Sequence, residues 1–305
     1  MTPDLVLLGN LLVDDLVFPD GRTRMAQAGG AMLYTSLGAV MWDARVGCVS
    51  LRGTDYPEAA LEHLRRRGVA LDGVVPLPGP GVRTWLLYEG GMRRVVHRLG
   101  GPTHTEVSPE VTQVPEAWLD AKVFHLAPMP IDLQGRIAEG LRARRPDAFI
   151  SIDPYELVTE ASLPRWRDVL AHADAFFPSE DDLLLEGADA DPRGTLRRLA
   201  GGRLRYVVWK RGSLGGLLWD AREDRVHEWA ARSNDVVDPT GAGDCFAAGF
   251  LAALLEGRGI DECLRRGVVT ASFVVEAWGP EALLHTRRAD AEARMRAWYG
   301  EEATR

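Results

Sequence analysis

Short, continuously apolar runs alternate along this chain with longer segments of helical period. The apolar runs cover residues 5–8, 45–49, 123–126, 148–152, 175–177 and 206–209, and the helical segments cover 30–42, 57–67, 133–145, 163–173 and 192–199. Such alternation predicts repeated βα units around a mainly parallel sheet. Runs without polar alternation indicate strands covered on both faces. We therefore predict a three-layer α/β/α sandwich, formed by residues 1–305 as a single domain.

Two places break this alternation and predict hairpins. Residues 11–18 and 23–27 flank Pro19-Asp20-Gly21, and residues 83–88 and 93–99 flank Glu89-Gly90-Gly91-Met92. Glycine-bearing connections of this length join antiparallel strands. The hairpins could extend the edge of the main sheet or form a small β lid over a cleft. We favour a lid, near residues 11–27 and 82–99, because both hairpins lie between core units.

Composition excludes several classes of function. With 36 basic and 44 acidic side chains the net charge is −8, so the chain has no general attraction for nucleic acid, and any anion must be bound locally. The three cysteines have no C-x-x-C spacing, which disfavours a disulfide framework or a cysteine zinc site and fits a reducing cytoplasm. No apolar stretch approaches the roughly 20 residues that span a bilayer, so we expect no membrane partner.

The most informative segment is the glycine-rich turn at 235–244, which precedes an apolar helical segment at 245–255. Pro239 favours a turn, and Gly241 and Gly243 permit tight backbone before the helix begins. Amides at the start of a helix lack partners, and the helix dipole is positive there, so the turn could hold a phosphate. Asp244 would then be an ionised carboxylate that accepts a proton from a substrate hydroxyl. The alternative is an ordinary aspartate at a helix N-terminus.

The turn Asp238-Pro239-Thr240-Gly241-Ala242-Gly243-Asp244 resembles the carboxy-terminal signature of the ribokinase-like carbohydrate kinases, the PfkB family. Further matches occur in the same order along nearly the whole chain, at Gly9 to Asp14, Gly29-Gly30, Gly53-Thr54-Asp55, Gly68-Val69 and Lys210 to Gly215. The resemblance implies a ribokinase-like fold, ATP and Mg²⁺. It makes Asp244 the catalytic base and Gly241, Ala242 and Gly243 the anion hole.

The resemblance also implies residues that contact the acceptor, namely Asp14, Gly29, Gly30 and Tyr34. Asp14 follows the first strand, where its two oxygens could accept hydrogen bonds from adjacent hydroxyls, although Asp15 is equally placed. Tyr34 stands where the family usually has an asparagine. A phenol cannot reproduce the paired donor and acceptor of an amide, so the identity of the acceptor stays open.

On the nucleotide side the resemblance assigns Lys210, Gly212, Ser213, Gly215 and Thr240 to the border of the ATP site. Ser179 and Asp182 match the family's Asn-x-x-Glu motif near magnesium, while a Ser N-cap with acids in the first helical turn is the alternative. Asp238 matches a position that holds a monovalent cation in some relatives. Arginines of the second hairpin, such as Arg83, are more often solvated than bound to phosphate. His104 and His125 have no second metal ligand at a suitable spacing.

These interpretations predict ATP-dependent phosphorylation of a hydroxyl on a sugar or polyol. A nucleoside kinase and a myo-inositol kinase are alternatives, because Tyr34 removes the usual sugar contact. A catalytically silent, ligand-binding member of the same fold is a third, because Tyr34, Ser179 and Asp182 all depart from the family pattern. Since some relatives dimerise through their lids, the resemblance also admits a homodimer of this kind.

Overall fold

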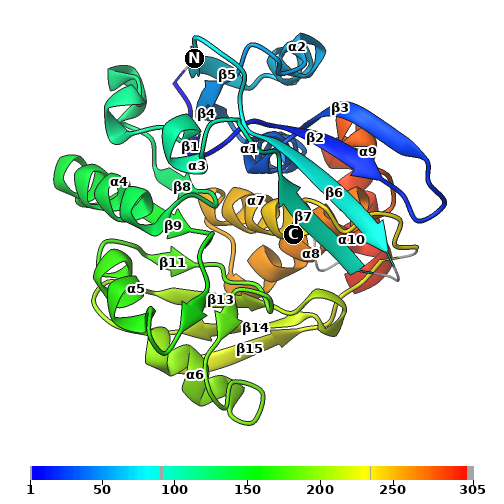
Figure 1. The fold of residues 1–305 in the computed structure, drawn as a ribbon. Helices are drawn as coiled ribbons and strands as arrows, with labels where there is room; N and C mark the ends of the chain where they lie inside the picture. Colours follow the sequence, from blue (N-terminus) through cyan, green and yellow to red (C-terminus); the bar gives the residue numbers. More distant parts are fainter. Residues whose placement is uncertain (1, 90–91, 234, 301–305) are drawn as a thin grey trace.

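A nine-stranded sheet forms the centre of the protein, which a computed structural model describes over residues 2–89, 92–233 and 235–300 (Figure 1). Its strand order is β15 (Arg225–Trp229), β14 (Gly216–Asp220), β13 (Tyr206–Lys210), β11 (Ala175–Phe176), β9 (Phe149–Ile152), β8 (Val123–Leu126), β1 (Leu5–Leu8), β4 (Val46–Arg52) and β5 (Ala70–Pro76). The strands from β13 to β5 are parallel, and β14 and β15 continue the sheet antiparallel. The predicted mainly parallel sheet is confirmed.

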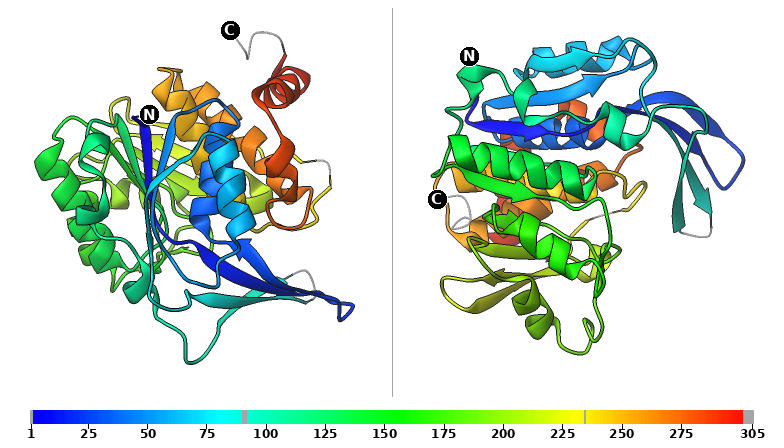
Figure 2. Two further views of the ribbon diagram at one scale, coloured as in Figure 1. Left: turned by 90° about the horizontal axis from the view of Figure 1, so that it is seen from above. Right: turned by 60° about the vertical axis from the view of Figure 1, so that its left-hand side comes forward.

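Helices cover both faces of this sheet, as Figure 2 shows from above. One face packs against α1 (Ala31–Val40), α2 (Glu58–Arg66), α7 (Ala242–Leu255), α8 (Ile260–Val275), α9 (Glu281–His285) and α10 (Arg288–Tyr299), and the other against α4 (Ile131–Arg144), α5 (Leu163–Leu170) and α6 (Pro192–Leu199). Strand β1 shows why its sequence is continuously apolar. Leu5 and Leu7 join one hydrophobic core, whereas Val6 and Leu8 join the other.

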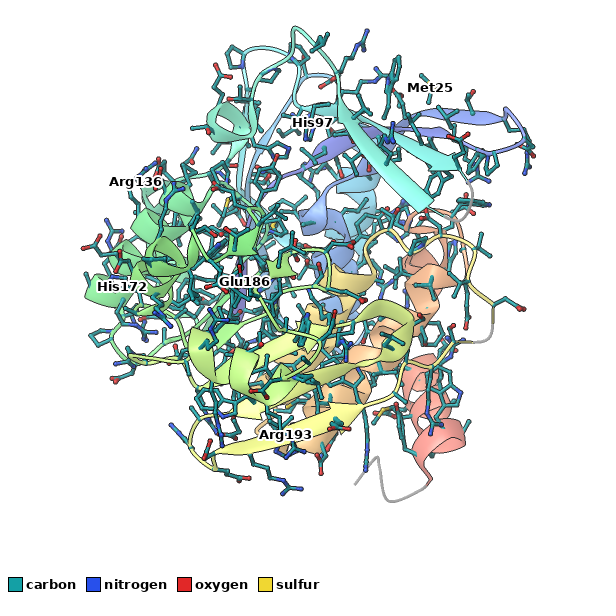
Figure 3. The ribbon with its side chains drawn as sticks, turned by 60° about the horizontal axis from the view of Figure 1, so that its bottom comes forward. Met25, His97, Arg136, His172, Glu186 and Arg193 are labelled. Atoms are coloured by element: carbon teal, nitrogen blue, oxygen red, sulfur yellow. The ribbon has the colours of Figure 1, made fainter. Side chains whose placement is uncertain are left out.

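The two predicted hairpins come together in a separate four-stranded sheet. Its order is β3 (Thr23–Gly29), β2 (Leu12–Val17), β6 (Arg83–Glu89) and β7 (Met92–His97). Strands β2 and β3 are antiparallel, as are β6 and β7, while β2 and β6 pair in parallel and join the hairpins. The sheet stands out from the main body (Figure 2), and Met25 and His97 mark its edge strands in Figure 3. It is therefore a separate layer and not an edge extension; the Gly90-Gly91 connection lies outside the described residues.

The small sheet docks on the main body through an aromatic cluster. Phe18 and Tyr88 both pack against Trp278, which follows α8, with ring centroids 4.3 and 5.5 Å apart respectively. Leu16 and Leu86 are buried in the same cluster. We call the face that carries Asp14, Thr84, Leu86, Tyr88 and His97 the inner face, because Tyr88 and Leu86 on it contact the main body.

Several elements differ from the sequence-based expectation. Strand β5 was not predicted, because Gly73 and Pro76 interrupt its apolar pattern. A two-stranded sheet of β10 (Val158–Thr159) and β12 (Leu183–Leu184) and the short helix α3 (His104–Val107) also appear. The last helix, α10, ends at Tyr299. Within the described ranges, every helix is too short or too polar to span a bilayer.

Candidate active site

Three polar side chains lie at the carboxyl ends of neighbouring parallel strands. Asp153 follows β9, Ser179 lies three residues after the end of β11, and Lys210 is the last residue of β13. Ser179 forms a parallel bridge with Lys210, so these strand ends are directly adjacent. In open α/β sheets this edge is where ligands bind.

The glycine-rich turn leads into the amino terminus of α7. Gly241 caps the helix with a φ of 79°, a left-handed conformation that favours glycine. Among the described residues, the amides of Gly241 and Gly243 have no hydrogen-bond acceptor, whereas the Ala242 amide donates to the Pro239 carbonyl at 3.2 Å. Asp244 is the third residue of the helix and is partly exposed. Two of the three predicted anion-hole amides are thus available, and Ala242 uses its own within the turn.

The carboxylate of Asp238 stabilises this turn through hydrogen bonds. It is buried and accepts from the Thr240 amide at 2.9 Å, the Gly279 amide at 3.0 Å and the Tyr88 hydroxyl at 2.7 Å. The Tyr88 hydroxyl also lies 2.8 Å from the Thr240 hydroxyl. Asp238 therefore ties the turn to the small sheet, and a monovalent cation at Asp238 would share its oxygens with these donors.

The Lys210 ammonium is paired with a carboxylate that the sequence did not single out. Its Nζ lies 2.7 Å from Asp153 Oδ2, and both side chains are largely buried. A Cβ on Gly243 would stand 3.0 Å from the same Nζ, so the ammonium lies over the glycine turn. Burial raises the pKa of Asp153 to about 7, with Lys210 opposing this and the charges of Asp244 and Asp182 adding to it. Its position after a predicted strand was the one available signal for Asp153.

Ser179 and Asp182 form a turn beside this pair. Asp182 Oδ2 accepts from the Ser179 amide at 2.8 Å and also from its hydroxyl. No α-helix begins here in the described chain, so the N-cap alternative for Ser179 is wrong. The carboxylate closes the turn at the end of β11 instead.

The segment after Lys210 is a short 3-10 helix (Gly212–Leu214) that connects β13 to β14. Gly212 and Ser213 are exposed. Gly215 adopts a φ of 82°, and a Cβ there would overlap the Trp229 carbonyl. Gly212 and Ser213 are therefore open to a ligand, whereas Gly215 is required by the turn itself.

Asp14 and Gly29, two of the residues predicted to contact the acceptor, fit together. Asp14 is buried, accepts from the Thr84 hydroxyl, and occupies the space that a Cβ on Gly29 would need. Gly30 has a φ of 90°, and a Cβ on it would overlap the Asn10 carbonyl. The two glycines thus allow the loop to close around the Asp14 carboxylate.

Asp15, the rival of Asp14 in the sequence, has a different environment. Arg83 donates to both of its oxygens, at 2.6 and 2.7 Å, and the Ala26 amide donates to Oδ1 at 2.7 Å. Burial opposes these donors, which together lower the pKa of Asp15. Asp15 and Arg83 therefore join strands of the small sheet to each other.

Tyr34 is buried beside the glycine turn. A Cβ on Gly241 would overlap its ring, and its hydroxyl oxygen lies 3.7 Å from a Cβ position on Gly279. Burial raises the pKa of Tyr34 well above its usual value, and the charges of Asp14 and Asp238 raise it further. Its hydroxyl is therefore a neutral group near both carboxylates.

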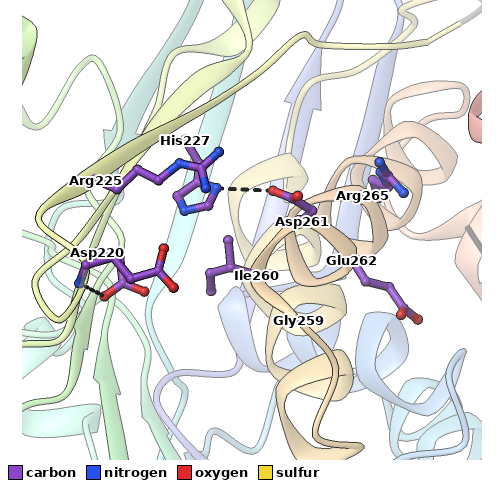
Figure 4. A pocket seen from close by; sticks show the side chains of 9 residues that line it. Asp220, Arg225, His227, Gly259, Ile260, Asp261, Glu262 and Arg265 are labelled. Atoms are coloured by element: carbon purple, nitrogen blue, oxygen red, sulfur yellow. Dashed lines mark hydrogen bonds and ion pairs between the residues drawn. The ribbon is translucent and has the colours of Figure 1, made fainter.

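A separate hollow of about 430 Å³ lies at the far end of β14 and β15, beside the amino terminus of α8 (Figure 4). Its described lining is a mixture of charges, with Asp220, Glu223, Arg225, His227, Asp261, Glu262 and Arg265, and contains none of the predicted site residues. His227 Nδ1 lies 3.1 Å from Asp261 Oδ1. The hollow is thus distinct from the strand ends that carry Lys210 and Asp153.

The amino-acid sequence is similar to a known protein family and to characterised relatives. The family model described as pfkB family carbohydrate kinase matches residues 20–287. A cytidine kinase of Thermococcus kodakarensis is 33% identical over 282 residues, which cover 90% of this chain and 97% of that protein.

Two solved structures share the fold across almost the whole chain. A ribokinase II of E. coli in complex with ATP and Mg²⁺ has a TM-score of 0.75 at 20% identity, and the match covers 97% of this chain and 100% of that one. A nucleoside kinase of Burkholderia thailandensis in complex with inosine has a TM-score of 0.74 at 15% identity, with coverages of 97% and 98%. The predicted ribokinase-like fold is confirmed.

Proposed function

Because the chain belongs to the PfkB family of carbohydrate kinases, we propose that it transfers the γ-phosphoryl group of ATP to a hydroxyl group of a nucleoside. One observation carries the phosphotransfer chemistry. Asp244 follows two glycine amides that have no acceptor among the described residues, and the Lys210 ammonium lies over the same turn. A base, two donors for a developing anion and a cation are the groups that phosphoryl transfer requires.

In the proposed reaction Asp244 accepts the proton of the attacking hydroxyl. The hydroxyl oxygen forms a bond to the γ-phosphorus, the bond from that phosphorus to the β–γ bridging oxygen breaks, and ADP leaves. The amides of Gly241 and Gly243 donate to the phosphoryl oxygens as their charge redistributes, and the positive end of α7 acts in the same direction. Ala242 supports the turn through its bond to Pro239.

The nucleotide phosphates would lie along the ends of β11 and β13, where Lys210, Gly212, Ser213 and Thr240 border them. Among the described residues, no group of three or more His, Cys, Asp or Glu could enclose a metal ion alone. Mg²⁺ suits such a site, because it retains waters and takes phosphate oxygens with one or two carboxylates. Asp182 and Asp153 are the carboxylates that would hold it, and when bound it would neutralise phosphate charge.

The acceptor would bind where Asp14, Gly29, Gly30 and Tyr34 meet. Asp14 Oδ1 accepts one hydrogen bond from Thr84, and each carboxylate oxygen can accept two such bonds, so a pair of substrate hydroxyls could also donate to Asp14. A ribose unit offers such a pair whether it is free or part of a nucleoside. We favour a nucleoside over a free sugar or polyol because the cytidine kinase relative matches nearly the whole chain.

The small sheet would act as a lid that excludes water during transfer. Tyr88 supports this role, because its hydroxyl bonds Asp238 and Thr240 of the turn. A monovalent cation at Asp238 and a homodimer through the lid remain predictions. Trp85 and Val96, which are opposite each other on the outer face and are 44% and 39% exposed, would suit such a dimer.

The test is an assay for ADP release from ATP and Mg²⁺ with cytidine, inosine, ribose, myo-inositol and a panel of sugars. Turnover with at least one nucleoside at a higher kcat/KM than with any free sugar or polyol supports the proposal. Preference for a sugar or inositol would return the function to that class. No turnover with any acceptor, together with measurable ligand binding, would identify a catalytically silent member.

A further inference from the structure

A row of side chains crosses the inner face of the small sheet, starting at Asp14. The strand register places Asp14 beside Thr84, and Thr84 beside His97. Registered partners point to the same face, so His97 lies two strand spacings, about 10 Å, from Asp14. A ribose bound at Asp14 does not span this distance alone, whereas a ribose that carries a ring substituent does.

At the far end of this row three rings from separate segments meet. The rings of His97 on β7 and His104 on α3 have centroids 5.0 Å apart, and His104 lies 4.7 Å from Tyr155, in the loop after β9, at a tilt of 36°. Tyr155 is 39% exposed and His97 is exposed as well. We call these three residues the ring cluster. Its open faces are suited to stacking against a flat ligand.

His104 contacts the loop that follows β1, and one of its ring nitrogens has no hydrogen-bond partner among the described residues. Its Nδ1 lies 3.2 Å from the Asn10 amide nitrogen, and Asn10 Oδ1 accepts from the Ser108 hydroxyl at 3.0 Å. The Asn10 carbonyl stands against Gly30, next to the Gly29 that accommodates Asp14. His104 Nε2 is buried and has no partner among the described residues.

The ring of His104 is uncharged at neutral pH. Burial, together with the charge of the neighbouring His97, lowers the pKa of His104 to about 4. A neutral ring nitrogen can pair with the polar edge of an uncharged ligand, and such pairing would satisfy the buried Nε2.

We propose that the ring cluster of His97, His104 and Tyr155 receives the planar heterocyclic base of a nucleoside whose ribose is bound at Asp14. This inference rests on the proposed function and adds to it the part of the site that distinguishes a nucleoside from a free pentose. The bases of nucleosides combine a flat π face with polar edge atoms, which are the two features that the ring cluster can bind. A second sugar ring lacks the flat π face that would stack against these rings.

The experiment compares cytidine, inosine and ribose as acceptors for the full chain and its variants. Tyr155→Ala and His97→Ala remove exposed rings that make little contact with the core. Each should raise KM for cytidine and inosine about 10-fold or more and leave KM for ribose and ATP within about two-fold. Arg94→Ala is the matched control, because Arg94 is exposed on the outer face of the same strand and should leave all four values unchanged.

A second readout does not depend on turnover. Calorimetric titration of cytidine without ATP should show about 10-fold weaker binding to Tyr155→Ala, whereas Tyr155→Phe, which keeps the ring, should bind like the wild type. Equal losses for ribose and nucleosides, or unchanged nucleoside binding in both alanine variants, would overturn the base site while the nucleoside kinase function stands. A wild type that phosphorylates ribose and no nucleoside would overturn both.

Discussion

The Lys210 ammonium lies 2.7 Å from the Asp153 carboxylate and over the amide backbone of Gly243. The two residues end separate parallel strands, so the sheet itself fixes their distance. Lys210 is therefore positioned next to the glycine turn without a bound anion. An arriving phosphate group would compete with Asp153 for this ammonium, which makes the pair a point where nucleotide binding can be tested directly.

Replacement of Lys210 by Met should raise KM for ATP roughly 10- to 100-fold, because a charge-assisted hydrogen bond to phosphate is lost. KM for the acceptor should change much less. Without the Lys210 charge, the Asp153 carboxyl should take up a proton, and the protein should remain folded. The double variant Lys210→Met/Asp153→Asn should show no additional loss of stability, and its KM for ATP should be at least as high as that of Lys210→Met, because it also lacks a carboxylate proposed to hold Mg²⁺. An unchanged KM for ATP in Lys210→Met would exclude the lysine from nucleotide binding.

Replacement of Asp244 by Asn should lower kcat by about 10²- to 10⁴-fold, since general base catalysis contributes on that scale. The amide keeps the shape of the side chain, so ATP affinity measured by titration should stay within a few-fold of the wild type. Asp235→Asn, at the exposed first position of the same segment, serves as the control. Full turnover by Asp244→Asn would end the base assignment.

Asp14 and Asp15 should separate cleanly in an acceptor assay. Asp14→Asn should raise KM for the acceptor 10-fold or more and leave KM for ATP nearly constant, because a carboxylate that accepts two hydroxyl bonds is lost. Asp15→Asn should instead reduce the free energy of unfolding by about 2–3 kcal/mol, since Arg83 and the Ala26 amide lose a charged partner. Equal effects of Asp14→Asn on both KM values would make Asp14 a structural residue.

Removal of one hydroxyl should uncouple the small sheet from the glycine turn. Tyr88→Phe keeps the packing against Trp278 but loses the bonds to Asp238 and Thr240. We expect kcat/KM to fall about 10-fold, because a hydrogen bond to a charged group is lost at the position where the small sheet meets the turn. Trp85→Phe, on the outer face of the same strand, should have no such effect. A similar decrease in both variants would attribute the loss to the sheet as a whole.

The buried side chain of His125 should make the folded protein less stable as the pH falls. His125 is fully buried, its Nδ1 lies 2.9 Å from the Ser151 hydroxyl, and burial, together with the charge of Lys210, lowers its pKa to about 3. In the unfolded chain histidine binds a proton below about pH 6.5, whereas folded His125 does not until about pH 3. His125 therefore contributes its full stabilisation above about pH 6.5. This contribution to the free energy of unfolding falls by up to about 1.4 kcal/mol for each pH unit between about pH 6.5 and pH 3.

Urea unfolding at pH 7.5, 6.0 and 5.0 tests this effect. His125→Gln should be less stable than the wild type at pH 7.5, and the difference should shrink as the pH falls, because glutamine does not titrate. A constant difference across the three pH values would show that His125 does not contribute to the acid sensitivity.

The sequence predicted the elements whose pattern is set by burial, and it missed those that depend on neighbours. Strand β1 was readable because Leu5–Leu8 is apolar on both faces. Strand β5 was not, because an edge strand tolerates Gly73 and Pro76. The hairpins were predicted from their turns, but nothing local indicated the parallel pairing of β2 with β6 that joins them.

The same distinction applies to the candidate site. The glycine turn and Asp244 form one continuous motif, so they could be found from the sequence alone. Asp153 and Tyr88 are isolated in the sequence and reach the turn through pairing of strands and docking of the small sheet. The ring cluster draws one residue from each of three segments, and His104 on its own gave no reason to expect Tyr155 beside it.

The contact between Tyr34 and Gly241 limits how this protein can be re-engineered. The aromatic ring that we propose to border the acceptor also fills the space beside the backbone that would hold the phosphoryl group. A smaller residue at position 34, introduced to widen acceptor choice, would leave that backbone without its support. Variants designed to accept new substrates at full turnover should therefore change Tyr155 and His97. These positions can be varied while Tyr34 continues to support the glycine turn.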